Sequence, residues 1–182
     1  MFEGKTPVSR YFHQNYFMKK FLFATLLICM TIGTGFAQSN IDHEKAVKMV
    51  IDKLFMGMQK GDSTMVREAF TSQVSLATIF RTKTDGSVMT RENSLAGFLK
   101  AVGTPHKETW YEEYWNLKIN IDGDLASAWC DYAFYVDNNF SHCGVDAFQL
   151  HKGNDGWKIF HLADTRRKTG CEVPAEIQNK HK

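Results

Sequence analysis

The chain has 182 residues, of which 43% are hydrophobic and 23% charged, with 22 basic and 20 acidic side chains. Four basic residues and one acidic residue lie in the first 37 positions, so the remaining 145 residues carry 18 basic and 19 acidic side chains. That balance excludes a basic surface for nucleic acid or acidic membranes, and the length suits one domain with one core.

Residues 1–37 have the pattern of a leader. Lys19 and Lys20 precede a nearly uncharged run over 21–36, which closes on small residues at Gly35 and Ala37. This order is typical of a secretory signal peptide, so we expect cleavage after Ala37 and a periplasmic or secreted protein with no membrane span after cleavage.

Two alternatives to a cleaved signal peptide remain. The apolar run could stay as an uncleaved anchor, or the chain could be a lipoprotein whose mature form begins at Cys29. Ile28 stands where a lipoprotein signal has a small residue, which disfavours the second alternative. Met18 fits a translation start better than Met1 does, because residues 1–17 show no structural pattern.

Helices are predicted for the first part of the mature chain. Residues 42–60 place one apolar stripe at helical spacing, formed by Val47, Val50, Ile51, Leu54, Phe55 and Met58. Gly61 ends this helix, and Asp62 or Ser63 caps a second, short one. A strand over Val74–Thr82 then turns at Asp85-Gly86 into a short partner at residues 87–89.

A third helix is expected to begin with Thr90 as its cap and to end at Gly103. From Trp115 to Cys171 the chain alternates strands and turns, with turn signals at Asp122-Gly123, at residues 137–139 and at residues 154–156. Helices followed by such a long antiparallel meander predict an α+β fold.

The faces of the meander depend on loop length. Trp115, Leu117, Ile119 and Ile121 are expected to share the inner face with Ala126, Ala128, Cys130, Tyr132 and Phe134. A three-residue loop at 137–139 then brings His142, Gly144, Asp146, Phe148 and Leu150 to that face, whereas a two-residue loop turns them outward. We favour the first, because Phe148 and Leu150 then cover small alanines. In the last strand, His161 points inward unless a bulge near Phe160 brings Leu162 and Asp164 inward instead.

Three cysteines follow the leader, namely Cys130, Cys143 and Cys171. An odd number in an exported protein leaves at least one free thiol or an intermolecular bridge, and the sequence leaves the pairing open. The spacings C-x-x-C, H-x-x-x-H and H-E-x-x-H do not occur in the chain. We therefore predict neither a metal ion nor another cofactor.

The order helix, short helix, hairpin, helix and long meander resembles the nuclear-transport-factor-2-like superfamily, which includes SnoaL-type cyclases and ketosteroid isomerases. The resemblance covers about residues 42–171 and is nearest to the bacterial subset described as "putative lumazine-binding". The segments that carry it are Ile121–Ala126, His142–Phe148, Gly156–Ile159 and Asp164–Arg167.

The resemblance implies a cone, in which about three N-terminal helices close over a curved, mostly antiparallel sheet and leave a pocket at the wide end. It assigns residues 38–171 to one domain, and we expect residues 172–182 to be a flexible polar tail. Members are often dimers through the outer face of the sheet. Leu125, Trp129 and Tyr135 are apolar and lie opposite the assigned core, so we expect a homodimer here.

The candidate ligand-binding residues follow from the same assignment of faces. His142 and Asp146 lie on the inner face of the same strand, with Gly144 between them on that face. Asp164 approaches from the next strand, so a histidine stands near carboxylates, as a general base or a ligand-orienting donor requires. In the Glu112-Glu113 pair, Glu113 is the carboxylate expected to point inward. Aromatic side chains that stack on a flat heterocycle or enclose an apolar ligand complete the set, namely Trp115, Tyr132 and Phe148.

Three functions compete. The favoured one is an exported domain that binds a small molecule of unknown identity, such as a flat heterocycle. The second is a cofactor-free isomerase, dehydratase or hydrolase that acts through His142 and Asp146. The third is a dimeric interaction module, which a pocket plugged by Trp115 and Phe148 would favour. The full residue set of ketosteroid isomerases is not matched, because Asp146 and Tyr132 are only loose counterparts. This mismatch disfavours the hypothesis that the protein is an isomerase.

Overall fold

The computed structural model describes residues 41–84 and 86–182. The predicted leader, with its cleavage site, lies outside these residues. Within the described part, residues 41–60 are helical, and the expected stripe is buried: Val47, Ile51 and Leu54 have no exposed surface. Gly61 then takes a φ of 64°, which allows the chain to leave the helix at once.

Two short helices follow. In α2 (Ser63–Glu68) the Asp62 side chain accepts a hydrogen bond from the backbone N–H of Met65 at 2.9 Å, so the predicted cap is confirmed. The predicted start of the third helix is wrong, because Thr90 pairs with Thr78 inside a hairpin. This helix, α3 (Ala96–Gly103), begins later, and the hydroxyl of Ser94 accepts a bond from its first N–H.

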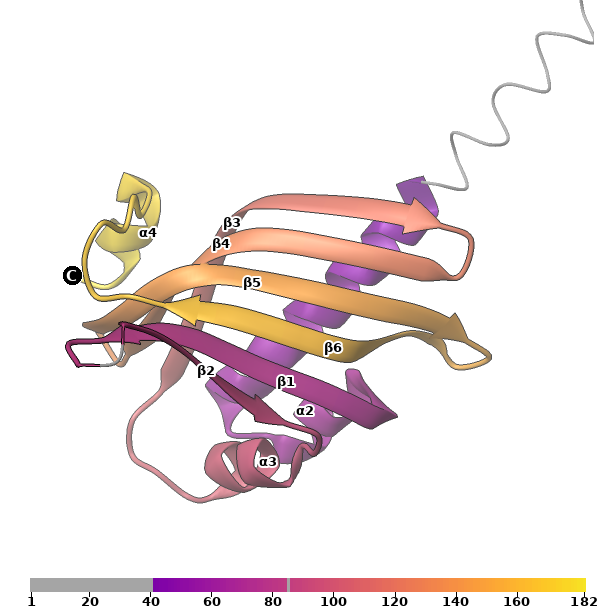
Figure 1. The fold of residues 1–182 in the computed structure, drawn as a ribbon, viewed down its shortest axis with the longest axis horizontal. Helices are drawn as coiled ribbons and strands as arrows, with labels where there is room; N and C mark the ends of the chain where they lie inside the picture. The colour runs from indigo at the N-terminus through magenta and orange to yellow at the C-terminus, as the bar shows by residue number, and fades with distance from the viewer. Residues whose placement is uncertain (1–40, 85) are drawn as a thin grey trace, which may run out of the picture. The chain divides into compact units, whose positions relative to one another are not determined.

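Six strands form one sheet, in the order β2-β1-β6-β5-β4-β3 (Figure 1). All neighbouring pairs are antiparallel except β1 with β6, which is parallel. The expected α+β class with a curved, mostly antiparallel sheet is therefore confirmed. The strands are β1 (Phe70–Thr82), β2 (Gly86–Glu92), β3 (Trp110–Asp122), β4 (Leu125–Val136), β5 (Asn139–Gly153) and β6 (Gly156–Arg166).

The loop between β4 and β5 differs from the prediction but leads to the predicted faces. Val136 pairs with Asn139, so the loop has two residues, not three. Ser141 is then an extra residue on β5, because Tyr135 pairs with Phe140 and Phe134 pairs with His142. This bulge reverses the alternation once more, and His142, Asp146 and Leu150 return to the inner face.

A bulge in β3 makes another prediction wrong. Trp115 pairs with Asp131 and Lys118 pairs with Trp129, so Asn116 and Leu117 together oppose a single residue of β4. Asn116 has a φ of 52°, a left-handed conformation that asparagine tolerates better than most residues. N-terminal to this bulge the faces are exchanged, so Trp115 and Glu113 point outward and Glu112 points inward.

A third bulge lies in β6. Gln149 pairs with His161 and Leu150 pairs with Ile159, which leaves Phe160 as the extra residue. This is the alternative that the sequence left open. It places Leu162 and Asp164 on the inner face, where Asp164 is directly opposite Asp146 of β5.

The main core lies between the inner face of the sheet and the long helix, which runs behind the sheet in Figure 1. The buried side chains that the sheet contributes to it are Phe70, Ala126, Ala128, Cys130, Phe148, Leu150, Trp157 and Ile159. No helix among the described residues is long and apolar enough to cross a membrane.

A second, smaller core lies on the outer face of the sheet. The segment expected to be a flexible tail instead carries α4 (Ala175–Lys180), whose Ile177 is only 5% exposed and packs with Ala133, Tyr135 and Cys143. Cys171 is disulfide-bonded to Cys143, and Cys130 remains a buried free thiol. The prediction of a polar tail was wrong because it overlooked the apolar residues Val173 and Ile177, which need a partner surface.

Candidate functional site

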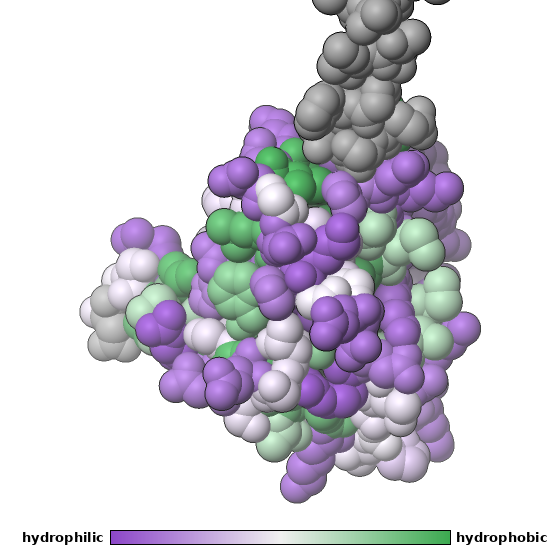
Figure 2. Space-filling model, turned by 90° about the vertical axis from the view of Figure 1, so that its right-hand side faces the viewer, coloured by the Kyte–Doolittle hydropathy of each residue, from purple (hydrophilic) through white to green (hydrophobic). Residues whose placement is uncertain are grey.

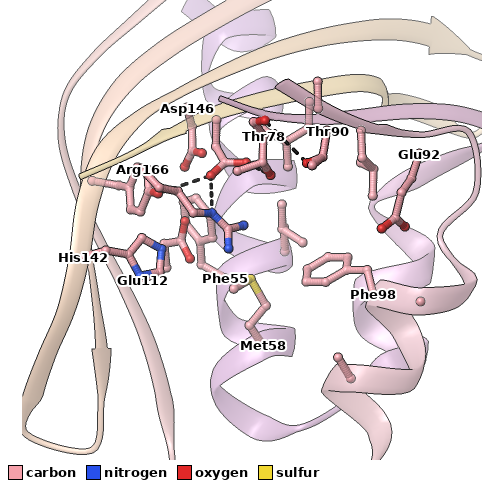
Figure 3. A pocket seen from close by; sticks show the side chains of 18 residues that line it. Phe55, Met58, Thr78, Thr90, Glu92, Phe98, Glu112, His142, Asp146 and Arg166 are labelled. Atoms are coloured by element: carbon pink, nitrogen blue, oxygen red, sulfur yellow. Dashed lines mark hydrogen bonds and ion pairs between the residues drawn. The ribbon is translucent and has the colours of Figure 1, made fainter. Parts of the chain in front are cut away.

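A pocket of about 320 Å³ lies between the inner face of the sheet, the long helix and α3. Figure 3 shows Glu112, His142, Asp146 and Arg166 gathered on one side of the pocket, with Phe98 and Glu92 on the opposite side, and Phe55 and Met58 also line it. Apolar surface beside a few convergent polar groups is the usual composition of a small-molecule site.

Gly144 makes the polar end possible. Tyr132 pairs with Gly144 across β4 and β5. A Cβ atom at Gly144 would lie 1.7 Å from the carbonyl oxygen of Thr165 and 2.8 Å from the Tyr132 ring. Because glycine leaves this space open, the Tyr132 hydroxyl reaches across and donates a hydrogen bond to the Thr165 carbonyl at 3.0 Å.

Asp164 has a full set of hydrogen-bond partners. Its carboxylate accepts from the Thr78 hydroxyl at 2.6 Å and from Arg166 Nε at 2.7 Å, and the Tyr132 hydroxyl, which donates to Thr165, lies 3.3 Å from it. Burial and the surrounding carboxyl groups raise the pKa of Tyr132, so this hydroxyl stays protonated and acts as a donor. Asp164 and Arg166 therefore form an ion pair at the wall of the pocket.

Glu112 and Asp146 lack such partners. Asp146 is 2% exposed, and its Oδ2 atom has no hydrogen-bond partner within the described part of the chain. Burial, and then the charges of neighbouring carboxylates, raise the pKa of Glu112 to about 7 and the pKa of Asp146 well above its usual range. The charge of Glu112 contributes to the rise in the pKa of Asp146, and such a pair of carboxyl groups favours the state in which one of them holds a proton.

His142 lies half-buried beside this pair. Its ring contacts the rings of Tyr132 and Phe134, and the Ser141 hydroxyl is 3.0 Å from its Nδ1. Burial and then the positive charge of Arg166 lower the pKa of His142 to about 4, so the imidazole is neutral near pH 7. Such a group is a weak base but a competent hydrogen-bonding partner.

The structure brings together four of the six residues predicted to bind a ligand. Tyr132, His142, Asp146 and Asp164 all line the pocket. Phe148 is 1% exposed in the core, where its ring meets Phe55. Trp115 belongs to the small outer core instead, so neither aromatic plugs the pocket as the interaction-module hypothesis required.

Among the pocket residues that sequence reasoning missed are Glu112 and Arg166, which lie beside Asp146 and Asp164. Strict alternation placed Glu113 inward, and only recognition of the bulge at Asn116 could have selected Glu112. Arg166 stood in a short basic cluster that is typical of a solvated strand end. Its position two residues after Asp164 on one strand was the available signal, because residues i and i+2 share a face.

No hydrogen bond joins His142 to Asp146 among the described residues; the ring of His142 lies beside Ser141, and Asp146 is influenced by Glu112. Among the described residues, no group of three His, Cys, Asp or Glu side chains is arranged to hold a metal ion. The chemistry available at this end of the pocket is therefore that of two carboxyl groups that share a proton, next to a neutral imidazole and an ion pair.

A family model described as "Putative lumazine-binding" matches residues 42–161. No curated protein matches the chain. Among solved structures, a nuclear-transport-factor-2-like protein of unknown function from Shewanella baltica is similar, with 19% identity and a TM-score of 0.52 over 71% of this chain and 97% of the other.

Two further solved structures are similar in fold. A putative scytalone dehydratase from Novosphingobium aromaticivorans has 10% identity and a TM-score of 0.59 over 76% of this chain and 93% of the other. A putative dehydratase of the nuclear-transport-factor-2-like family from Streptomyces avermitilis has 14% identity and a TM-score of 0.53 over 72% and 99%. At these identities the similarity concerns the fold.

Proposed function

The chain belongs to the putative lumazine-binding family of the nuclear-transport-factor-2-like superfamily, and we propose that it is an exported domain that binds a small organic molecule in the pocket of its curved sheet. The observation that carries this proposal is the buried Asp146 oxygen without a partner, at the end of a cavity of about 320 Å³. A buried polar group left unpaired costs about 1–3 kcal/mol, and a ligand that donates to it recovers that cost.

Native mass spectrometry of the protein purified from its host tests this proposal. Ala101 lines the pocket from α3, whereas its neighbour Lys100 does not. We expect the wild type to retain a small molecule that Ala101→Trp excludes by filling the cavity, and Lys100→Trp to retain it as a matched control. An adduct that survives in Ala101→Trp would place the ligand elsewhere.

A cofactor-free enzyme is the second candidate. It is favoured by the carboxyl group of Glu112, whose pKa burial raises to about 7. A group that is half-ionised near neutral pH can both remove and return a proton, as isomerases and dehydratases require. In this structure Glu112 and Asp146 are the candidate acid and base, and His142 positions a substrate as a neutral imidazole. Turnover that Glu112→Gln abolishes while ligand affinity persists would favour the enzyme over the binding domain.

The export of the domain is supported by the leader pattern and by the Cys143–Cys171 disulfide. Disulfides form and persist in oxidising compartments and are rare in the cytosol. N-terminal sequencing of the protein recovered from the periplasm or the medium is expected to begin at Gln38. A lipid-linked chain beginning at Cys29 would replace export as a free protein by membrane anchoring through a lipid.

A homodimer through the outer face of the sheet is the last part of the proposal. Leu125 and Trp129 are each 53% exposed on this face, while Tyr135, the third residue expected there, is covered by α4. The end of the molecule shown in Figure 2, where the β3–β4 and β5–β6 turns lie, is mostly hydrophilic. Light scattering is expected to give a dimer that Trp129→Ser dissociates; a monomeric wild type at micromolar concentration contradicts this.

A further inference from the structure

We propose that the ligand is an organic cation, an amidine, guanidine or protonated amine on an apolar body, whose N–H groups bind the Glu112–Asp146 pair. This inference rests on the proposed binding function, since it names the chemical class that the same pocket accepts. It goes beyond that function because it fixes the sign of the charge on the ligand.

The charges that line the pocket are unequal. The described lining residues include four carboxylic acids, Glu92, Glu112, Asp146 and Asp164, and one permanent cation, Arg166. Arg166 is 2.7 Å from Asp164, which neutralises its charge locally. His142 is neutral near pH 7, so the lining supplies no second cation for the Glu112–Asp146 pair.

The pocket also has more unsatisfied hydrogen-bond acceptors than unsatisfied donors. The Arg166 side chain is 51% exposed, so water can satisfy the N–H groups that Asp164 leaves free. Asp146 is 2% exposed, and its Oδ2 atom has no hydrogen-bond donor among the described residues. One proton shared between two carboxyls satisfies only one oxygen of each, so the remaining acceptors need a donor that the ligand brings.

A cation meets both needs, and an anion meets neither. An amidinium or ammonium group presents several N–H donors together with a positive charge, and its bonds to carboxylates are about twice as strong as neutral ones. A carboxylate or phosphate would find one cation, Arg166, which Asp164 already pairs, and would meet the carboxyl groups of Glu112 and Asp146 beside it. The apolar side chains of the pocket, Phe55, Met58 and Phe98, accommodate the hydrocarbon or aromatic body.

Cation binding is linked to proton release. The groups that face the pair are Tyr132 and Cys130 from β4, His142 from β5, Asp164 and Arg166 from β6, while the long helix presents apolar side chains. Without a ligand the pair keeps a proton because burial and the charges of neighbouring carboxylates, Asp164 among them, oppose its ionisation. A bound cation reverses this balance, so affinity rises as the pH increases toward and above 7.

Three probes of one shape test the sign of the charge on the mature chain, residues 38–182. Benzamidine is a cation, benzamide is its neutral counterpart and benzoate is an anion. We expect titration calorimetry at pH 8 to give benzamidine an affinity roughly 10- to 100-fold above that of benzamide, since charge-assisted bonds contribute about 1.5–3 kcal/mol. Benzoate is expected not to bind. Benzamidine affinity is expected to fall at pH 5.5 and to show proton release when buffers of different ionisation enthalpy are compared.

A matched pair of variants locates the probe. Glu112→Gln is expected to remove the preference for benzamidine over benzamide, whereas Glu113→Gln, which changes the neighbouring residue on the opposite face, is expected to preserve it. Equal or tighter binding of benzamide or benzoate overturns the cation proposal but leaves the pocket as a ligand site. Equal benzamidine binding by both variants and the wild type also overturns the proposal. Absence of binding by all three probes overturns it as well, and loss of the retained molecule in the native spectra would separately overturn the binding function.

Discussion

Glu112 and Glu113 are consecutive residues of β3, yet the two faces of the sheet treat their carboxyl groups in opposite ways. On the outer face, α4 brings Lys180 within 2.7 Å of Glu113 and His181 within 3.3 Å. On the inner face, Glu112 meets another carboxyl group, and its pKa is raised to about 7. The outer face gives Glu113 a lysine as an ion-pair partner, whereas the inner face places Glu112 beside a second acid.

The outer face of the sheet is stabilised by packing and a cross-link, whereas the inner face keeps features that lower the stability of the fold. The outer face is closed by the Cys143–Cys171 disulfide, by Ile177 and by the stacking of His181 on Tyr135, whose ring centroids are 3.9 Å apart. The inner face leaves space and unpaired acceptors where a larger apolar side chain could have filled the cavity. Sites that keep such costs are the places where function is expected.

The largest effect is expected from opening the outer face. Cys171→Ser removes a cross-link between residues 28 apart in the sequence, which is expected to lower the free energy of unfolding by about 3–4 kcal/mol. Urea denaturation measures the change. The variant is expected to be insensitive to a reducing agent that destabilises the wild type; an unchanged midpoint would show that α4 packing, not the disulfide, holds this face.

The second effect compares the two glutamates directly. The folded state holds a proton on Glu112 between pH values of about 4.5 and 7, while the unfolded chain has lost it, so the wild type loses stability as the pH rises through this window. Glu112→Gln is expected to be more stable than the wild type by roughly 1–3 kcal/mol at pH 8 and equal to it at pH 4. Glu113→Gln is expected to lose up to about 1 kcal/mol. Thermal unfolding at the two pH values measures both, and a Glu112→Gln variant less stable than the wild type at pH 8 would contradict the burial of an uncompensated charge.

The smallest effect concerns His142. Its pKa is lowered to about 4 in the folded protein, so the unfolded state takes up protons first and the wild type loses stability as the pH falls from about 6.5 to 4. The His142→Gln variant is expected to lose less stability than the wild type over this interval and to bind the retained ligand more weakly. Unfolding curves at pH 4 and pH 7 measure the difference. Parallel losses in variant and wild type would assign the acid sensitivity to another group.

The sequence predicted the class, the first two helices and most of the inner face, because apolar periodicity is repeated over many residues. It did not predict where alternation breaks. The bulges at Asn116 and Ser141 each add one residue, which no periodic pattern records. Because the bulge at Asn116 was missed, Glu113 and Trp115 were predicted on the inner face, where the structure has Glu112 and Tyr114. The turn error and the bulge at Ser141 cancelled, so His142 and Asp146 were placed correctly on a wrong loop length.

The remaining errors arose from long-range contacts. Arg166 gains its role from Asp164 and from the buried carboxyls of other strands, and α4 gains its position from the disulfide and from the outer face of β4 and β5. Local sequence cannot show either, since a polar strand end and a short polar segment also occur as solvated surface.

The parallel pairing of β1 with β6 has a consequence for the order in which the protein acquires its site. Thr78 and Asp164 are hydrogen-bonded although they lie 86 positions apart, so one wall of the pocket closes only after nearly the whole chain has been synthesised. Contacts this distant carry a large loop-closure entropy and slow the folding rate. The helices and the β1–β2 hairpin therefore cannot join the rest of the sheet before β6 is present. A chain that stops before β6 has only part of the scaffold and lacks the wall of the pocket that holds Asp164.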